Sequence, residues 1–506
     1  MIKTLKTFGL ATLLTSVLAC GSHTKKEIKT VKQPNIIFFL VDDMGWMDTS
    51  INGSEYYETP NMERLAKMGM KFTHAYAANP LCSPTRSSIL TGQDPARVRI
   101  TMPGGHLPPN PNQDLSAKKG APWQKMATPD SRTFLTTNQF TIAEALKDNG
   151  YTTAHIGKWH LGQKGYWPED HGFDINIGGQ QHPGPPSYFS PYKIPNLPNG
   201  EKHEYITDRV TKEAVNFLDN QTKDKPFFLN VWQYGVHAPY QAPKELIAKY
   251  AAKKDPRGKQ NSPIMGGMME KVDESLGAIL DKLEALDIME DTVIVFYSDN
   301  GGNMYDVVNG DFPTNNYPLS FGKGNIYEGG IRVPCIVSWK GKIKPHSTSD
   351  EIIQSTDFYP TLLDITNTKQ NPEQKLDGIS LSDLLTKQKP LNRKAVFSHF
   401  PHYVPATGNY PTTAVWHEDY KLLKVYGEGP NRTPEYKLFN LKEDISESNN
   451  IAANKEKLVQ SMTKMLDNYL NDIDALVPVK NPNYKKGSKS KFGIPPIFPI
   501  KNYPSY

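Results

Sequence analysis

The sequence predicts an α/β protein with a large domain, built on a central, mostly parallel sheet flanked by helices, and a smaller C-terminal α+β domain. Three observations support this prediction. From Pro34 onward, short apolar runs alternate with segments of helical periodicity, which indicates a parallel sheet. The 506 residues suffice for two or three domains. After about Lys387 the pattern changes to short strands and one long helix, so we place the domain boundary between 34–386 and 387–506.

The predicted elements follow one another in order. Asn35 to Val41 is a continuous apolar run, which is typical of a strand buried on both faces. Thr59 and Pro60 predict the start of a helix that ends near Gly69, because threonine caps helices and proline suits the first helical position. Further strands are predicted at 151–156, 226–232, 292–297, 332–339, 395–399 and 420–426, and further helices at 141–149, 208–218, 268–286, 357–365 and 455–473. Two segments rich in proline and glycine, 101–132 and 178–200, predict long loops near the functional site.

The N-terminus predicts export. A positively charged start precedes an apolar run from Phe8 to Ala19, which is too short to span a bilayer but typical of a signal peptide. The run ends in Val-Leu-Ala-Cys, which resembles a bacterial lipobox with Cys20 as the lipid-bearing first residue. We therefore predict a lipoprotein signal peptide over 1–20, a tether over 21–33, and a bacterial membrane anchor that faces the periplasm or the cell surface. The alternative is an ordinary signal peptide cleaved nearby.

Charge and cysteine content narrow the function. The net charge of +5 and the absence of a long run of Lys and Arg give no indication of a nucleic-acid partner. Of the three cysteines, Cys335 lies in an apolar, strand-like run and is predicted to be a buried structural thiol. We therefore expect no disulfide, although an exported protein could form one.

Charged and metal-binding residue types follow four of the predicted strands. They are Asp42 and Asp43 after the first strand, Lys158 and His160 after the second, His237 after the third, and Asp299 and Asn300 after the fourth. Ligands of parallel α/β sheets bind at the carboxyl ends of the strands. Carboxylate and amide oxygens suit calcium or magnesium, and paired carboxylates would repel one another without a cation. Lysines, Arg86 and histidines could hold a tetrahedral anion and transfer protons.

A five-residue motif narrows the prediction further. Cys82-Ser83-Pro84-Thr85-Arg86 matches C-x-P-x-R, and Leu90-Thr91-Gly92 follows it. This motif resembles that of the formylglycine-dependent (type I) sulfatases. The resemblance extends in family order over Val41 to Gly45, Gly157 to Gly162, Val236 to Pro239, Ser298 to Gly302 and Gly322 to Gly324.

The resemblance implies an alkaline-phosphatase-like fold and an arylsulfatase-like sulfuric ester hydrolase. It implies that a formylglycine-generating or other sulfatase-maturing enzyme converts Cys82 to formylglycine (3-oxoalanine). The resemblance also implies one calcium ion, held by Asp42, Asp43, Asp299, Asn300 and the modified Cys82. Arg86 would stabilise the hydrated formylglycine, and Lys158 and Lys323 would bind the sulfate. His160 would accept a proton, and His237, or alternatively Lys323, would be the general acid.

The expected substrate is a sulfated carbohydrate, such as an oligosaccharide released during polysaccharide degradation. His106, His182, His203 and Tyr188 lie in or beside the long loops and are candidate sugar contacts. Two alternatives remain open. One is a phosphate or phosphonate ester hydrolase of the same superfamily, and the other is a catalytically silent lipoprotein that binds sulfated glycans.

Overall fold

The structure, a computed structural model, describes residues 33–305 and 312–490. Contacts divide the chain into a unit over Met1–Gln33 and a unit over Pro34–Tyr506, and all elements below belong to the second. The predicted signal peptide and Cys20 lie outside the described residues. None of the helices in the described ranges is long and apolar enough to cross a membrane.

The main sheet of the described residues has eight strands, and its order is β10-β2-β9-β8-β1-β7-β5-β6. In that order the strands are Ser347–Ser349, Met70–Phe72, Cys335–Trp339, Thr292–Ser298, Asn35–Val41, Phe227–Trp232, Thr152–Gly157 and Ile175–Ile177. All neighbouring pairs are parallel except those of β9, which is antiparallel to both β8 and β2. The predicted fold class, an α/β domain with a mostly parallel sheet, is therefore confirmed.

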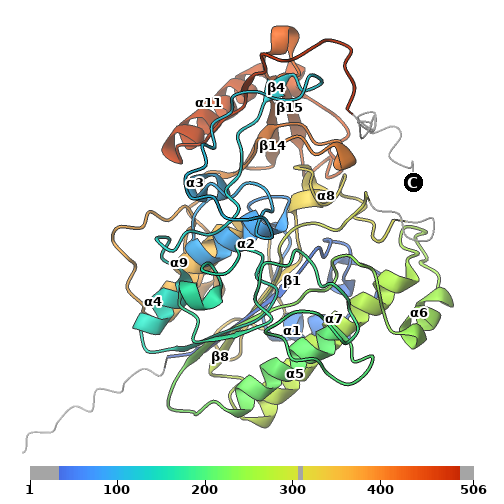
Figure 1. The fold of residues 1–506 in the computed structure, drawn as a ribbon, viewed down its shortest axis with the longest axis vertical. Coiled ribbons are helices and arrows are strands. Elements are labelled where there is room, and N and C mark those ends of the chain that lie inside the picture. The colour runs from blue at the N-terminus through green and yellow to red at the C-terminus, as the bar shows by residue number, and fades with distance from the viewer. Residues whose placement is uncertain (1–32, 306–311, 491–506) are drawn as a thin grey trace, which may run out of the picture. The chain divides into compact units, whose positions relative to one another are not determined.

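Helices cover both faces of this sheet (Figure 1). Strand β1 shows why: Phe38 belongs to one hydrophobic core and its neighbour Phe39 to the other, because successive side chains of a strand point to opposite faces. The first core includes side chains of α2 (Cys82–Thr91), α4 (Ile142–Asp148) and α9 (Phe358–Ile365). The second core includes side chains of α1 (Pro60–Met68), α5 (Ile206–Asp219) and α7 (Pro263–Ala285).

The cap of α1 and the start of α7 differ from the prediction. Thr59 precedes α1, but its side chain does not cap the helix. Instead, the Asp273 carboxylate of α7 accepts hydrogen bonds from the backbone N–H groups of Asn61 and Met62, at 3.0 and 2.9 Å. Helix α7 begins at Pro263, earlier than predicted, and Ser262 caps it. The cap of α1 therefore comes from Asp273 of α7, a residue far away in the sequence.

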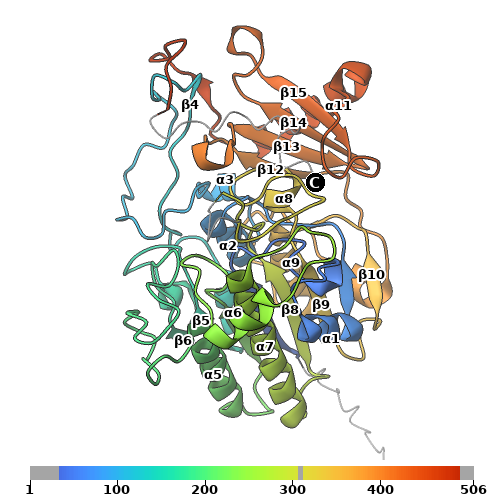
Figure 2. The same cartoon turned by 90° about the vertical axis from the view of Figure 1, so that its right-hand side faces the viewer.

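The C-terminal part contains a second sheet, of four antiparallel strands in sequence order: β12 (Val396–Phe400), β13 (Thr412–His417), β14 (Tyr420–Val425) and β15 (Glu435–Asn440). Helix α11 (Glu456–Asp472) packs on one face through Met462 and Leu466 (Figure 2). Trp416 and Leu423 on the other face join the first core of the main sheet. The boundary predicted at 386/387 falls at the end of α10 (Ser382–Lys387) and stays a prediction.

A buried charge network connects the two sheets. The Glu328 carboxylate accepts hydrogen bonds from Lys421 Nζ at 3.0 Å, Trp416 Nε1 at 2.9 Å and the Tyr76 hydroxyl at 2.8 Å. Lys421 also pairs with Glu447 at 2.7 Å, and both of these side chains are fully buried. Buried charges are stable only when they are paired. The network therefore holds Glu328 in place, and Glu328 follows the predicted site residue Lys323 by five positions.

Candidate active site

The parallel strands β8, β1, β7 and β5 lie side by side and end at one edge of the sheet, where the predicted polar residues follow them. Backbone hydrogen bonds join the neighbouring strand ends. The N–H of Asp42 donates to the carbonyl of Gly235 at 2.8 Å, and the N–H of Asp299 donates to the carbonyl of Val41 at 3.1 Å. The structure thus brings together, at one edge of the sheet, the residues that follow the four predicted strands.

Cys82 is the first residue of α2, and its side chain points into this group. Its Sγ lies 3.5 Å from Nδ1 of His160, and ligand atoms of Asp42, Cys82 and Asp299 all lie within 4.8 Å of one another. Burial raises the pKa of the Cys82 thiol, despite the nearby ammonium of Lys158. Since the thiolate is the reactive form, an unmodified thiol here is a poor nucleophile at neutral pH.

Arg86 lies one turn further along α2 and is fully buried. Its Nε donates to Oδ2 of Asp299 at 2.8 Å, and its Nη1 donates to the carbonyl of Lys158 at 2.9 Å. Its guanidinium stands over the Trp232 ring at 5.2 Å. These contacts link Arg86 to residues at the ends of β8, β5 and β7, so it acts as a rigid cationic centre behind the cysteine.

Two lysines each form an ion pair with one of the carboxylates. Lys158 Nζ donates to Asp42 Oδ2 at 2.5 Å, and Lys323 Nζ donates to Asp43 Oδ2 at 2.6 Å. Burial acts to raise the pKa of Asp43, but the ammonium of Lys323 and other nearby cations hold it below its usual value. Burial and the neighbouring Asp42 carboxylate raise the pKa of Asp299 to about 7. The carboxylates are therefore crowded enough to favour an added cation.

Two oxygens of this group are suited to bind a metal ion. Asp42 Oδ1 and Asn300 Oδ1 are buried and have no hydrogen-bond partner among the described residues, although buried acceptors are normally satisfied. The amide nitrogen of Asn300 donates to Asp43 at 2.8 Å, which directs the amide oxygen elsewhere. An all-oxygen set of carboxylates and an amide fits calcium or magnesium.

His237 lies in the loop that follows β7, and its ring is close to the carboxylate of Asp43. Its Nδ1 lies 2.7 Å from the carbonyl of Ala238, so Nδ1 carries a proton, and Nε2 lies 3.7 Å from Asp43 Oδ2. Burial and the charge of Lys323 lower the pKa of His237 to about 3. The imidazole is therefore neutral at pH 7, and its Nε2 is on the side of the Asp43 carboxylate.

Tyr188, a candidate sugar contact, proves to be structural. Its side chain is fully buried, and its hydroxyl lies 2.9 Å from the carbonyl of Tyr234 and 2.6 Å from that of His237. Its hydroxyl therefore holds the backbone of the loop that carries His237. The sequence signal was misleading because a proline- and glycine-rich segment suggests exposure, whereas this part of it packs into the second core.

The three loop histidines differ in their positions. His106 reaches the site, with its Nδ1 3.1 Å from Nε2 of His160. His182 lies near Gly184, which is so close to His237 that a Cβ atom there would lie 2.6 Å from the ring. The Nε2 of His182 is buried and has no hydrogen-bond partner in the described part of the chain. His203 is exposed, and no hydrogen bond within the described ranges links it to the site.

Residues of the C-terminal part also lie beside Lys323. A small cavity of about 40 Å³ beside Lys323 is lined by Met304, Tyr305, Phe321, Gly322, Lys323, Ala406 and Thr407. The Thr407 hydroxyl donates to the carbonyl of Gly324 at 2.8 Å. Sequence reasoning missed Ala406 and Thr407 because they belong to no motif and lie far along the chain from Lys323.

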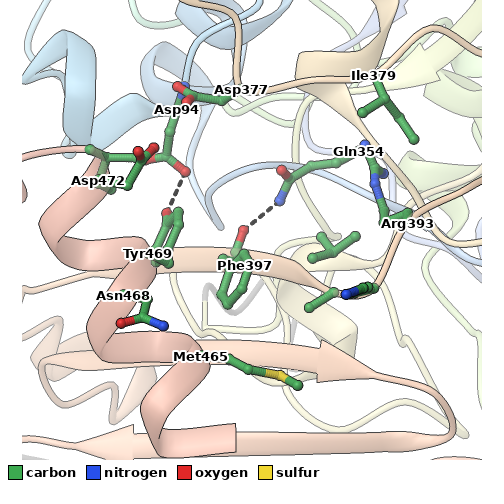
Figure 3. A pocket seen from close by; sticks show the side chains of 14 residues that line it. Asp94, Gln354, Asp377, Ile379, Arg393, Phe397, Met465, Asn468, Tyr469 and Asp472 are labelled. Carbon is green, nitrogen blue, oxygen red and sulfur yellow. Dashed lines mark hydrogen bonds between the residues drawn. The ribbon is translucent and has the colours of Figure 1, made fainter.

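A larger cavity lies away from this chemistry. It measures about 540 Å³, and Figure 3 shows it between α11, β12 and the segment that follows α2. Its polar groups pair with one another: the Tyr469 hydroxyl donates to Asp94 at 2.5 Å, and the Gln354 amide donates to the carbonyl of Phe397 at 2.7 Å. None of the predicted site residues lines it, so cavity size does not locate the active site here.

Comparisons with known proteins agree with the geometry. The sequence model of the sulfatase family matches residues 34–368, and a model described as N-sulphoglucosamine sulphohydrolase, C-terminal, matches residues 319–475. A sulfatase of Formosa agariphila is 31% identical over 87% of this chain and 88% of its own length. The N-acetylgalactosamine-6-sulfatase of Mus musculus is 31% identical over 71% of this chain and 68% of its own length.

Two solved structures are similar to this chain. The crystal structure of Ps i-CgsB in complex with k-i-k-neocarrahexaose is 28% identical, with a TM-score of 0.70 over 86% of this chain and 92% of that one. The phosphonate monoester hydrolase of Agrobacterium radiobacter is 17% identical, with a TM-score of 0.61 over 91% of this chain and 99% of that one, and shows a shared fold alone.

Proposed function

The chain belongs to the sulfatase family of sulfuric ester hydrolases, and from this premise we propose that it removes sulfate from a sulfated carbohydrate at Cys82. The observation that carries the proposal is the position of Cys82, which lies near the carboxylates of Asp42 and Asp299, the ammonium groups of two lysines and the ring of His160. Two relatives support the substrate class. One is named N-acetylgalactosamine-6-sulfatase, and another was solved with k-i-k-neocarrahexaose bound.

We propose that Cys82 is converted to formylglycine by a sulfatase-maturing enzyme. Sγ then marks the place of the oxygens that the modified residue would carry. When hydrated, the modified residue supplies two hydroxyl groups on one carbon, one to attack sulfur and one to release sulfate afterwards. The raised pKa of the unmodified thiol agrees with this proposal, because a protonated thiol is a poor nucleophile.

We propose that Asp42, Asp43, Asp299 and Asn300 hold one calcium ion. Asp42 Oδ1, which lies 3.7 Å from Arg86 Nη2, and Asn300 Oδ1 accept no hydrogen bond among the described residues, which supports this ligand set. A bound calcium ion would lower the cost of bringing a sulfate ester next to an ionised nucleophile.

The protein's own side chains bind the anion and move protons. Lys158 and Lys323 lie close enough to Cys82 for their charges to act on its thiol, and their ammonium groups would bind the sulfate oxygens. The His160 Nδ1 faces position 82 and would accept the hydroxyl proton there. His237 Nε2 would donate a proton to the leaving alcohol only from the doubly protonated ring, which the low pKa of His237 disfavours at neutral pH, and Lys323 is the alternative donor.

Parallel assays on 4-nitrophenyl sulfate and 4-nitrophenyl phosphate test this function against the phosphate-hydrolase alternative. We expect kcat/KM for the sulfate ester to exceed that for the phosphate ester by at least about tenfold, because the family is one of sulfatases. Sulfate release from a panel of sulfated oligosaccharides, measured by ion chromatography, then identifies the carbohydrate. Binding of these oligosaccharides without sulfate release would favour the silent lipoprotein, and preference for the phosphate ester would overturn the proposal.

We also propose that the protein is exported and anchored by lipid on Cys20. The lipobox-like sequence before Cys20 supports this proposal. In a bacterial host given a labelled fatty acid, we expect the label on the wild-type protein and none on a Cys20→Ala variant. The variant should leave the membrane fraction. If the variant still carried label, the anchor would not be on Cys20.

A further inference from the structure

The start of the long loop at 101–132 is docked closely on the segment that carries His160. A Cβ atom on Gly105 would lie 2.2 Å from the His160 carbonyl oxygen, so only glycine permits this approach. On the other side, the Gln163 amide donates to the backbone carbonyl of His106 at 2.9 Å. Both contacts involve the loop backbone. They therefore hold His106 next to His160 without any contribution from the imidazole ring of His106.

Both ring nitrogens of His160 have a neighbour. Nδ1 lies 3.5 Å from Cys82 Sγ, and Nε2 lies 3.1 Å from Nδ1 of His106. The two imidazole rings are stacked, with centroids 5.4 Å apart. The His160 backbone is held as well, because its carbonyl accepts a hydrogen bond from the Ser83 hydroxyl at 2.7 Å.

This arrangement links the tautomers of the two histidines. Of two ring nitrogens that face each other across a hydrogen bond, one carries the proton and the other accepts it. The proton position on one nitrogen of a histidine is set by the partner of the other. If Nδ1 of His106 accepts, the proton of His160 stays on Nε2, and Nδ1 presents its lone pair to position 82.

We propose that His106 is a positioning residue for His160, a role that rests on the proposed sulfatase function. It holds the ring of His160 in place and fixes the tautomer that can accept a proton from residue 82. This role differs from the sugar contact that the sequence suggested for His106. It also gives the first long loop a part in the reaction itself.

Two substitutions at His106 separate the hydrogen bond from the ring. His106→Phe keeps an aromatic ring beside His160 and removes the acceptor, whereas His106→Asn retains an acceptor near the position of Nδ1. On 4-nitrophenyl sulfate, which contains no sugar, we expect His106→Phe to lower kcat about 10- to 100-fold with little change in KM. We expect His106→Asn to recover most of the loss. Leu107→Ala, at the neighbouring exposed residue, should match the wild type.

Every variant is first compared with the wild type for formylglycine content at Cys82 and for thermal midpoint. Wild-type kcat in His106→Phe on the aryl ester, with a higher KM only on sulfated oligosaccharides, would show a sugar contact and overturn the inference. Equal losses in His106→Phe and His106→Asn would also overturn it. Failure of the proposed function would look different, because the wild type itself would then release no sulfate from any ester.

Discussion

Replacing Cys82 with alanine should abolish sulfate release, with kcat lower by at least about 10⁴-fold. The Sγ atom lies within 4.8 Å of carboxylate oxygens of Asp42 and Asp299 and 3.5 Å from His160 Nδ1, so we expect no other side chain to replace the proposed formylglycine. The fold should persist, because the substitution removes one atom from a small buried residue. The assay measures turnover of 4-nitrophenyl sulfate and the thermal midpoint of the same preparation.

Cys335→Ala is the matched control for this prediction. Cys335 is also a buried thiol with a pKa raised by burial, but it lies within strand β9 in the hydrophobic core. Its substitution should cost about 1 kcal/mol of stability and leave turnover at the wild-type level. A folded Cys82→Ala protein that kept a tenth of the wild-type turnover would refute the assignment of the nucleophile.

If Asp299 holds the proposed calcium ion, replacing it with asparagine should remove most of that calcium and lower kcat roughly 1,000-fold, because such a metal contributes several kcal/mol to this kind of reaction. The amide has the shape of the carboxylate and retains an oxygen for Arg86, which donates to Asp299 Oδ2 at 2.8 Å. Its nitrogen then replaces Oδ1, which accepts a hydrogen bond from the Asp43 N–H at 3.1 Å, so the change removes the charge and one acceptor with little change of volume. Calcium per chain, measured by mass spectrometry of the metal, and kcat are determined on the same sample.

Asp94→Asn provides the control for burial of a carboxylate. Asp94 lies just beyond the other end of α2, and burial and the charge of Asp377 raise its pKa to about 7. Asparagine there should leave calcium content and kcat unchanged, because Asp94 lines the separate cavity of Figure 3. Full calcium content and wild-type turnover in the Asp299→Asn protein would contradict the proposed ligand set.

Much of the fold and of the candidate site could be predicted because both depend on local patterns. Buried parallel strands such as β1 appear in the sequence as apolar runs, and the residues that follow them share one edge once the strands lie side by side. Helix α2 was missed although its motif was recognised. Every residue of α2 is buried, including its serines, threonines and Arg86, so the helix has no polar face to reveal its period.

The remaining features depend on contacts between distant segments. No local pattern shows that Asp273 caps α1 or that Thr407 reaches the loop of Lys323. Tyr188 was misassigned for the same reason, because its role is set by the carbonyls that its hydroxyl contacts. The pairing of His106 with His160 also brings together residues that the sequence placed in separate roles.

The most direct test of the account is peptide mass spectrometry across Cys82 in protein purified from its native host. The proposed mechanism predicts a peptide about 18 Da lighter than the cysteine form, the mass change expected for conversion of the thiol to the formylglycine that acts as nucleophile. An unmodified thiol at Cys82 in protein that hydrolyses sulfate esters would contradict that mechanism.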